Sequence, residues 1–117
     1  MAGAVAIGGV FFRLKAPDAL AAWYTAHLGM VAGGASWQQQ AGPMIFAPFK
    51  ADSDYFPADR QWMVNFRVDD LAVLIVSLKA AGISVETRAE WDGDWGNFAR
   101  IHDPEGNPVE LWEAPAT

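Results

Sequence analysis

The sequence predicts an α+β fold made of two copies of one unit, each with a strand, a helix and three further strands. The first observation is a repeat: the runs VFFRL at 10–14 and VNFRV at 64–68 share Val, Phe, Arg and a final aliphatic residue. The second is that each run precedes a helical pattern ending at a glycine, Gly29 or Gly82. The third is the length of 117 residues, which fits one domain.

The first unit is predicted over 4–50. Its opening segment, 5–14, is rich in Val, Ile and Phe and reads as a strand. Pro17 and Asp18 then signal the start of a helix over 18–28. The apolar residues of this helix that recur at helical spacing are Leu20, Trp23, Tyr24 and Leu28. Short β-like pieces at 30–32, 36–40 and 43–49 complete the unit as an antiparallel meander.

The second unit is predicted over 61–114, after a polar surface linker at 51–60. It opens with a strand at 62–68, and Asp69 or Asp70 can cap a helix over 70–81. Three further strands are expected at 83–87, 97–101 and 109–112, with a turn at 103–107 before the last of them. Each unit is too small to close a core alone, so the two are expected to form a single domain over 1–117.

The composition excludes several classes of protein. The absence of cysteine rules out disulfides, thiolate metal sites and a thiol nucleophile, and it fits a reducing cytoplasm. The formal net charge of −6 and the scattered basic residues argue against nucleic acid as a partner. The apolar start, MAGAVAIGGVFF, has no basic region before it and is too short to span a bilayer, so no membrane partner is expected.

Three segments resemble the vicinal oxygen chelate superfamily: HLGM at 27–30, VNFRVDDL at 64–71 and DPEGNPVELWE at 103–113. This superfamily includes glyoxalase I, extradiol dioxygenases, fosfomycin-modifying enzymes and bleomycin-resistance proteins. The resemblance implies that two βαβββ units form an incomplete barrel around a cleft. It also implies a divalent metal held by residues of the first and last strands of each unit.

Most residues at the positions that the resemblance assigns to metal ligands have side chains that do not suit a metal ion. In the first unit they fall on Gly9 and on Ile45 or Ala47, and in the second unit on Met63 and Glu110. Glycine offers no side chain, and a thioether is ill suited to the hard or borderline ions that the superfamily uses. Because a catalytic metal normally needs about three protein ligands, we expect no metal and no other cofactor.

Alternation along the strands predicts which residues line the cleft. Val10, Phe12, Leu14, Val64, Phe66, Val68, Val109 and Leu111 are expected to pack on the helices. The opposite faces carry Gly9, Phe11, Arg13, Met63, Asn65, Arg67, Glu110 and Trp112. One carboxylate, two guanidiniums, an amide and large aromatic rings fit a small anionic or aromatic ligand. The alternative is a structural ion pair between Glu110 and Arg13 or Arg67.

Trp91 and Trp95 flank a hairpin-like turn at 92–94 and are expected to project over the mouth of the cleft. Exposed indoles usually contact a partner. For this pair, a lid over a ligand and a dimer contact are both open.

Three functions fit these features. The leading one is a metal-independent protein of the resistance type that binds a small organic molecule and forms a homodimer. The second is a lyase or isomerase of the glyoxalase I type, with Glu110 as general base and Arg13 or Arg67 stabilising an oxyanion. The third is a structural dimer without a ligand.

Overall fold

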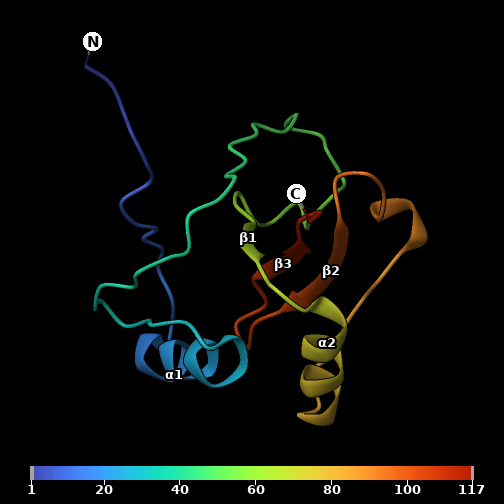
Figure 1. Ribbon diagram of the computed structural model, residues 1–117. Helices are drawn as coiled ribbons and strands as arrows, with labels where there is room; N and C mark the ends of the chain where they lie inside the picture. Colours follow the sequence, from blue (N-terminus) through green and yellow to red (C-terminus); the bar gives the residue numbers. More distant parts are fainter. Residues whose placement is uncertain (1, 117) are drawn as a thin grey trace.

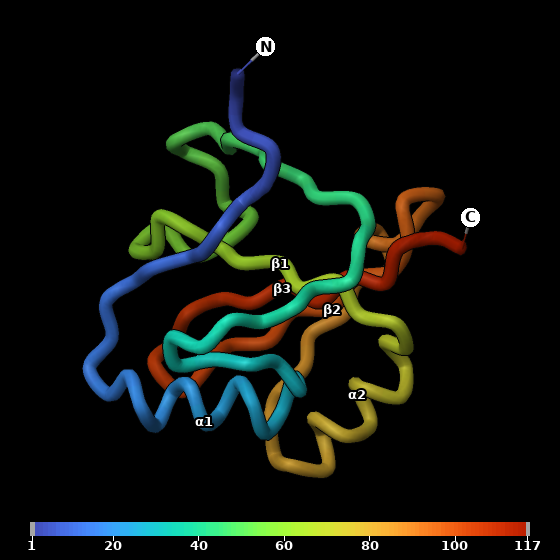
Figure 2. The backbone as a smooth tube through the Cα atoms, turned by 60° about the vertical axis from the view of Figure 1, so that its left-hand side comes forward, coloured from blue at the N-terminus to red at the C-terminus, as the bar shows by residue number. Residues whose placement is uncertain are grey.

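The computed structural model describes residues 2–116, which contain two α-helices, one 3-10 helix and a three-stranded sheet. The elements are α1 (Pro17–Leu28), β1 (Val64–Arg67), α2 (Leu71–Ala80), η1 (Ala89–Trp91), β2 (Asn97–His102) and β3 (Pro108–Glu113). The strand order is β1-β3-β2, with β1 parallel and β2 antiparallel to β3. Both helices lie on the same side of the sheet (Figure 1, Figure 2). No helix in the described chain is long and apolar enough to cross a membrane.

Both predicted helices form, and local sequence explains their ends. Pro17 opens α1 with a φ angle that the helix requires, and Gly29 ends it at φ 68°, where its N–H donates to the Thr25 carbonyl. Helix α2 begins after Asp70, whose side chain accepts a hydrogen bond of 3.2 Å from the Val73 N–H.

The core lies between these helices and one face of the sheet. Its buried members are Leu20, Tyr24, Leu71, Leu78, Ala99, Ile101, Val109 and Leu111. Phe66, Val68 and Leu14 pack against this cluster with partial burial. The alternation predicted for the strands at 64–68 and 109–112 is therefore confirmed at Phe66, Val68, Val109 and Leu111, which belong to this core or pack against it.

The turn at 103–107 also forms as predicted, and it joins the two halves of the chain. The buried Asp103 carboxylate accepts a 2.7 Å hydrogen bond from the Tyr24 hydroxyl on α1. The Glu105 carboxylate accepts from the N–H groups of Lys15 and Ala16, at 2.7 and 2.9 Å, just before α1. Burial, and then the bond to Asp103, raises the pKa of Tyr24 well above its usual value, so the phenol stays protonated as a donor. This turn fixes α1 against the sheet.

The strands predicted in the first half are absent from the structure. The segments 5–14, 30–32, 36–40 and 43–49 contain no helix or strand, and the chain before α1 leads away from the sheet (Figure 1, Figure 2). Val10 and Phe12, expected to pack on a helix, are 57% and 52% exposed. The physical reason is that a strand is stabilised by hydrogen bonds to a neighbouring strand, and in residues 2–116 these segments pair neither with one another nor with the edges of the sheet.

The predicted strand at 83–87 is reduced to a single bridge. Glu86 pairs with Arg100 through two backbone hydrogen bonds, of 2.9 and 2.8 Å, at the outer edge of β2. Asn97–His102 and Pro108–Glu113 form close to the predicted ranges of 97–101 and 109–112, whereas the strand expected at 62–68 is shortened to Val64–Arg67. Of the two predicted units, the second thus provides the whole sheet.

Candidate functional site

The face of the sheet opposite the helices carries a row of polar residues. The register pairs Asn65 of β1 with Glu110 of β3, and Glu110 with Arg100 of β2, so the three side chains lie side by side across the sheet. The next row contains Arg67, Trp112 and Phe98. We call these six residues the Glu110 face.

Glu110 is the central residue of this face and is only 8% exposed. Its Oε1 accepts a hydrogen bond of 2.8 Å from the Asn65 amide, and its Oε2 accepts one from the Tyr55 hydroxyl. Within residues 2–116 the ion pair that forms joins Arg88 to Glu86, so the predicted pair between Glu110 and Arg13 or Arg67 does not form. Neutral donors, rather than an arginine, hold the buried carboxylate.

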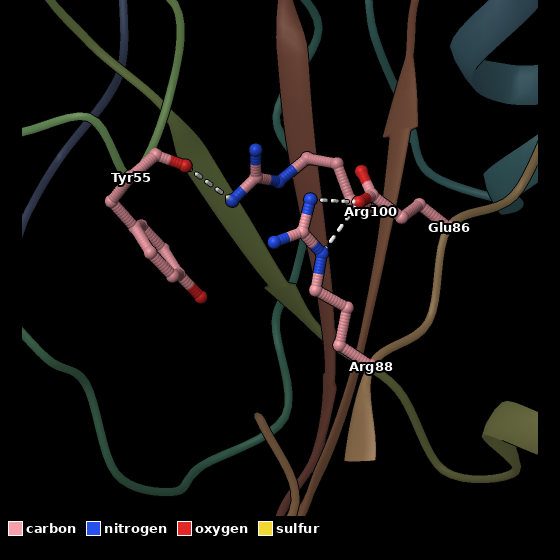
Figure 3. Close-up of polar contacts among 4 residues, drawn as sticks. All are labelled: Tyr55, Glu86, Arg88 and Arg100. Carbon is pink, nitrogen blue, oxygen red and sulfur yellow. Dashed lines mark hydrogen bonds and ion pairs between the residues drawn. The ribbon is translucent and has the colours of Figure 1, made fainter. Parts of the chain in front are cut away.

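Arg100 is the cation that the sequence analysis missed. It is 5% exposed, and its Nη2 donates a hydrogen bond of 3.1 Å to the Tyr55 carbonyl (Figure 3). Its guanidinium carbon lies 4.9 Å from the centre of the Tyr55 ring and 5.4 Å from that of Trp91. Its Nε finds no acceptor among the described residues. The site therefore has a buried positive charge with unused donor capacity.

The aromatic surroundings of Arg100 come from outside the sheet. Tyr55 lies in the connection before β1, and its ring meets those of Trp91 and Phe49 at 6.2 and 5.6 Å. Burial, and then the hydrogen bond to Glu110, raises the pKa of Tyr55 to about 12, so it is a neutral donor at physiological pH. On the sheet, Phe98 and Trp112 stack with their planes 5° apart.

An exposed ion pair lies beside this cluster. The Arg88 guanidinium lies 2.6 Å from the Glu86 carboxylate (Figure 3). Its central carbon lies 5.3 Å from the centre of the Trp91 ring. Hydrogen bonding to the Glu86 carboxylate and its charge raise the pKa of Arg88. Because both side chains are about half exposed, solvent screens this pair, and it contributes little to stability.

The other predicted site residues are dispersed. Arg67 donates to the carbonyls of Pro43 and Gln40, at 2.6 and 2.7 Å, and so anchors the first half of the chain to β1. Arg13 lines a separate cavity of about 810 Å³ beside the start of α1, together with Trp23 and Glu105. The remaining two lie before β1 or α1: Met63 is half-buried and Phe11 is 95% exposed.

Trp95 and Trp112 are connected through the turn that the sequence predicted. Gly93 and Gly96 pair as a tight hairpin, and the Trp112 indole donates 2.8 Å to the carbonyl of Trp95. Trp95 itself is 57% exposed, and its indole donates to the Trp91 carbonyl. The hairpin therefore fixes Trp91 beside Arg100 and leaves Trp95 free for contact with another molecule.

The donor set does not fit the metal that the superfamily resemblance implies. Glycine and methionine occupy two of the expected ligand positions, Gly9 and Met63, and Glu110 already accepts two hydrogen bonds from protein groups. In the described part of the chain, His, Asp and Glu side chains do not gather in any group of three that could hold an ion.

These observations define a small α+β protein with helices on one face of its sheet and a buried Arg, Glu and aromatic cluster on the other. The chain belongs to the glyoxalase-like domain family, whose sequence profile matches residues 9–112. This places it in the vicinal oxygen chelate superfamily. The crystal structure of TnmS3, an antibiotic binding protein from Streptomyces sp. CB03234, is similar at 23% identity and a TM-score of 0.48, over 84% of this chain and 86% of that one. No curated protein matches the chain.

The sequence contained a signal for Arg100 but none for Tyr55. Ala99 and Ile101 are apolar and alternate with Phe98 and Arg100, so a core position for the first pair places Arg100 on the opposite face of the sheet, which is the face of Glu110. Tyr55 lies in a polar stretch typical of a surface connection. Only the path of the chain brings its ring onto the sheet.

Proposed function

We propose that the protein binds a small organic molecule at the Glu110 face, without a metal, in the manner of a resistance protein that sequesters its ligand. The observation that carries this proposal is the buried Arg100 guanidinium, which has an unused donor and lies between two aromatic rings. Structural ion pairs satisfy their donors internally, whereas a guanidinium with spare donor capacity among aromatic rings favours an anionic or aromatic ligand.

Metal independence follows from the same residues. Glu110 is the one carboxylate among the six residues of the Glu110 face, and a catalytic metal normally needs about three protein ligands. Purified protein equilibrated with Zn²⁺, Ni²⁺, Mn²⁺ or Fe²⁺ and then dialysed should retain well below one ion per chain. Stoichiometric metal that is lost in Glu110→Gln would contradict this part of the proposal.

We further propose that the working form is a homodimer in which the first half of the chain completes its fold. The accessible area of 8881 Å² exceeds by about 40% the roughly 6,200 Å² of a compact monomer of this mass. The radius of gyration of 14.9 Å likewise exceeds the expected value of about 13.4 Å. The side chains that account for uncovered apolar surface include Val5, Phe11, Met44, Ile45, Phe46 and Trp62.

A second copy of the chain is the partner that we propose for this surface. Strand β1 is an edge of the sheet without a further strand beside it in residues 2–116, and exposed edges beside apolar side chains favour pairing with another chain. In such a dimer the segments at 5–14 and 43–49 gain the strand neighbours they lack, which gives the two βαβββ units of the predicted barrel. Sedimentation at tens of micromolar should give a dimer, and Phe46→Asp should shift it to monomer. A monomeric wild type would refute this arrangement.

Ligand binding is tested by a screen of small aromatic and carboxylate-bearing molecules, with indole emission as the signal. Trp91 and Trp112 lie at the site, so an occupied Glu110 face should change the emission. Arg100→Gln should weaken binding of any ligand found by about 10-fold or more, whereas Lys79→Gln, on the exposed end of α2, should leave it unchanged. If no molecule binds, the structural dimer without ligand is the better reading.

A lyase or isomerase reaction is the second candidate, and the pairing of Glu110 with Arg100 favours it. A buried carboxylate next to a buried guanidinium is the arrangement in which a base removes a proton and a cation stabilises the resulting oxyanion. In this mechanism Arg100 stabilises the oxyanion, the role that the sequence had suggested for Arg13 or Arg67. Turnover of a ligand from the screen that disappears in Glu110→Gln, with binding retained, would establish it.

A further inference from the structure

The Glu110 face already holds an aromatic group, the Tyr55 side chain of the same chain. We propose that the ligand class of this face is a phenol that also carries a carbonyl or carboxylate oxygen, and that such a molecule binds by replacing Tyr55. This inference rests on the proposed binding function and specifies its ligand. It also makes the connection around Tyr55 an internal competitor for the site.

Three contacts of the Tyr55 side chain together favour a phenol over an apolar ring without a hydroxyl. The hydroxyl donates to Glu110, the guanidinium of Arg100 lies 4.9 Å from the ring centre, and Trp91 meets the ring at 66°. A buried carboxylate favours a ligand with a hydroxyl donor. An aromatic ring without the hydroxyl would leave Oε2 of Glu110 without this hydrogen bond. The ring thus has an acceptor at its edge and a cation on its face.

A fourth contact recognises an oxygen outside the ring. The Tyr55 carbonyl accepts from Nη2 of Arg100 (Figure 3), so one residue provides both the phenol and the oxygen acceptor. The adjacent Nε of Arg100 has no acceptor in residues 2–116, although the side chain is 95% buried. A ligand whose oxygen engages both nitrogens would satisfy the guanidinium better than Tyr55 does.

The location of Tyr55 makes the exchange feasible. The tyrosine belongs to a connection with turns but no helix or strand, and the backbone bonds there are local, from Ser53 to Lys50 and from Arg60 to Pro57. Its N–H donates to the neighbouring Ser53 side chain at 3.3 Å. The contacts described above are therefore its main attachment to the sheet, and loops of this kind open at low free-energy cost.

Tyr24, in the same molecule, is a tyrosine that is packed permanently in the core. Its hydroxyl also donates to a carboxylate, Asp103, but its ring is 7% exposed within the core and is carried by α1. Asp103 additionally accepts from Asn107 and from the Glu105 N–H, so that carboxylate belongs to a rigid turn. Tyr24 is structural, whereas Tyr55 occupies a site.

The test uses N-acetyltyrosinamide, which carries a phenol and carbonyl oxygens, and N-acetylphenylalaninamide, which lacks only the hydroxyl. By calorimetry, Tyr55→Ala should bind the tyrosine compound about 10-fold more tightly than wild type does, because the internal competitor is gone. It should also prefer the tyrosine compound over the phenylalanine compound by about 10-fold. Adding Glu110→Gln should abolish that preference, and adding Arg100→Gln should weaken both compounds.

The matched control is Tyr24→Phe in the Tyr55→Ala background, which removes the other carboxylate-bound hydroxyl and should leave both affinities unchanged. If Tyr55→Ala fails to fold by circular dichroism, Tyr55→Phe retains the ring, loses the bond to Glu110 and should still bind the tyrosine compound several-fold more tightly than wild type. Equal affinities for the two compounds would overturn the phenol assignment. If another molecule from the screen binds in an Arg100-dependent way while neither compound does, the binding function stands and this inference falls; if nothing binds, both fall.

Discussion

The two halves of the chain start from the same sequence pattern and end in different structures. In the second half VNFRV becomes β1, paired along its length with β3 and packed on the helices through Phe66. In the first half VFFRL stays outside the sheet, with Phe11 95% exposed. A repeated pattern therefore specifies strand propensity and an apolar face, but a strand forms only where a neighbour supplies hydrogen bonds.

The largest expected effect is on the free energy of unfolding, and it compares a truncated apolar side chain in the second half with one in the first half. Leu78 is 1% exposed on α2, so Leu78→Ala should lower the free energy of unfolding by about 2–5 kcal/mol through lost burial and a cavity. Val10→Ala, in the repeat-related exposed segment, should change it by less than about 0.5 kcal/mol. Urea denaturation measures both. A Val10 effect as large as that of Leu78 would show that the first half is packed in solution.

The next effect concerns the turn that joins the halves. Asp103→Ala removes the acceptor for Tyr24, Asn107 and the Glu105 N–H, and should cost about 2–4 kcal/mol, because several buried donors lose their partner. Tyr24→Phe removes one of these bonds and should cost about 1 kcal/mol. Equal losses in the two variants would mean that the rest of the turn contributes little.

A smaller effect is expected on ligand affinity, where Arg100 of the second half is compared with Arg13 of the first half. For a ligand of the Glu110 face, Arg100→Ala should weaken binding by about 1.5–3 kcal/mol, the range for hydrogen bonds to a charged group. Arg13→Ala should have no effect, because Arg13 lines the cavity beside α1. The titration of both variants with one ligand decides between this placement and the cleft that alternation alone predicted for Arg13.

The smallest effect is the part of the pH dependence of stability that Tyr55 contributes. Its pKa rises from 10.0 to about 12 on folding, so the neutral phenol contributes stability that is present below about pH 10 and is lost as pH rises toward about 12. Tyr55→Phe should show a shallower decline over this range than wild type. Parallel stability curves for the two proteins would indicate that the phenol has an ordinary pKa in the folded state.

Much of the second half could be predicted from the sequence, for reasons that are local. Helix α2 has an Asp70 cap and an apolar face that reaches Leu71 and Leu78, and the alternation around Glu110 puts Val109 and Leu111 in the core. Asn65 was assigned to the face of Glu110 by the same alternation, and it donates to that carboxylate. In the first half, α1 formed as predicted, whereas the strands expected around it do not form within residues 2–116.

The sequence by itself determined the helices, the turn at 103–107 and the burial of β3, because capping, turn residues and alternation are properties of neighbouring residues. Tertiary structure alone decided that Arg67 binds the carbonyls of Pro43 and Gln40 and not Glu110, and that Tyr55 folds over Glu110 and Arg100. The physical reason is that these contacts join residues 24 to 55 positions apart in the chain, and no periodicity within a segment encodes which distant segment becomes its neighbour.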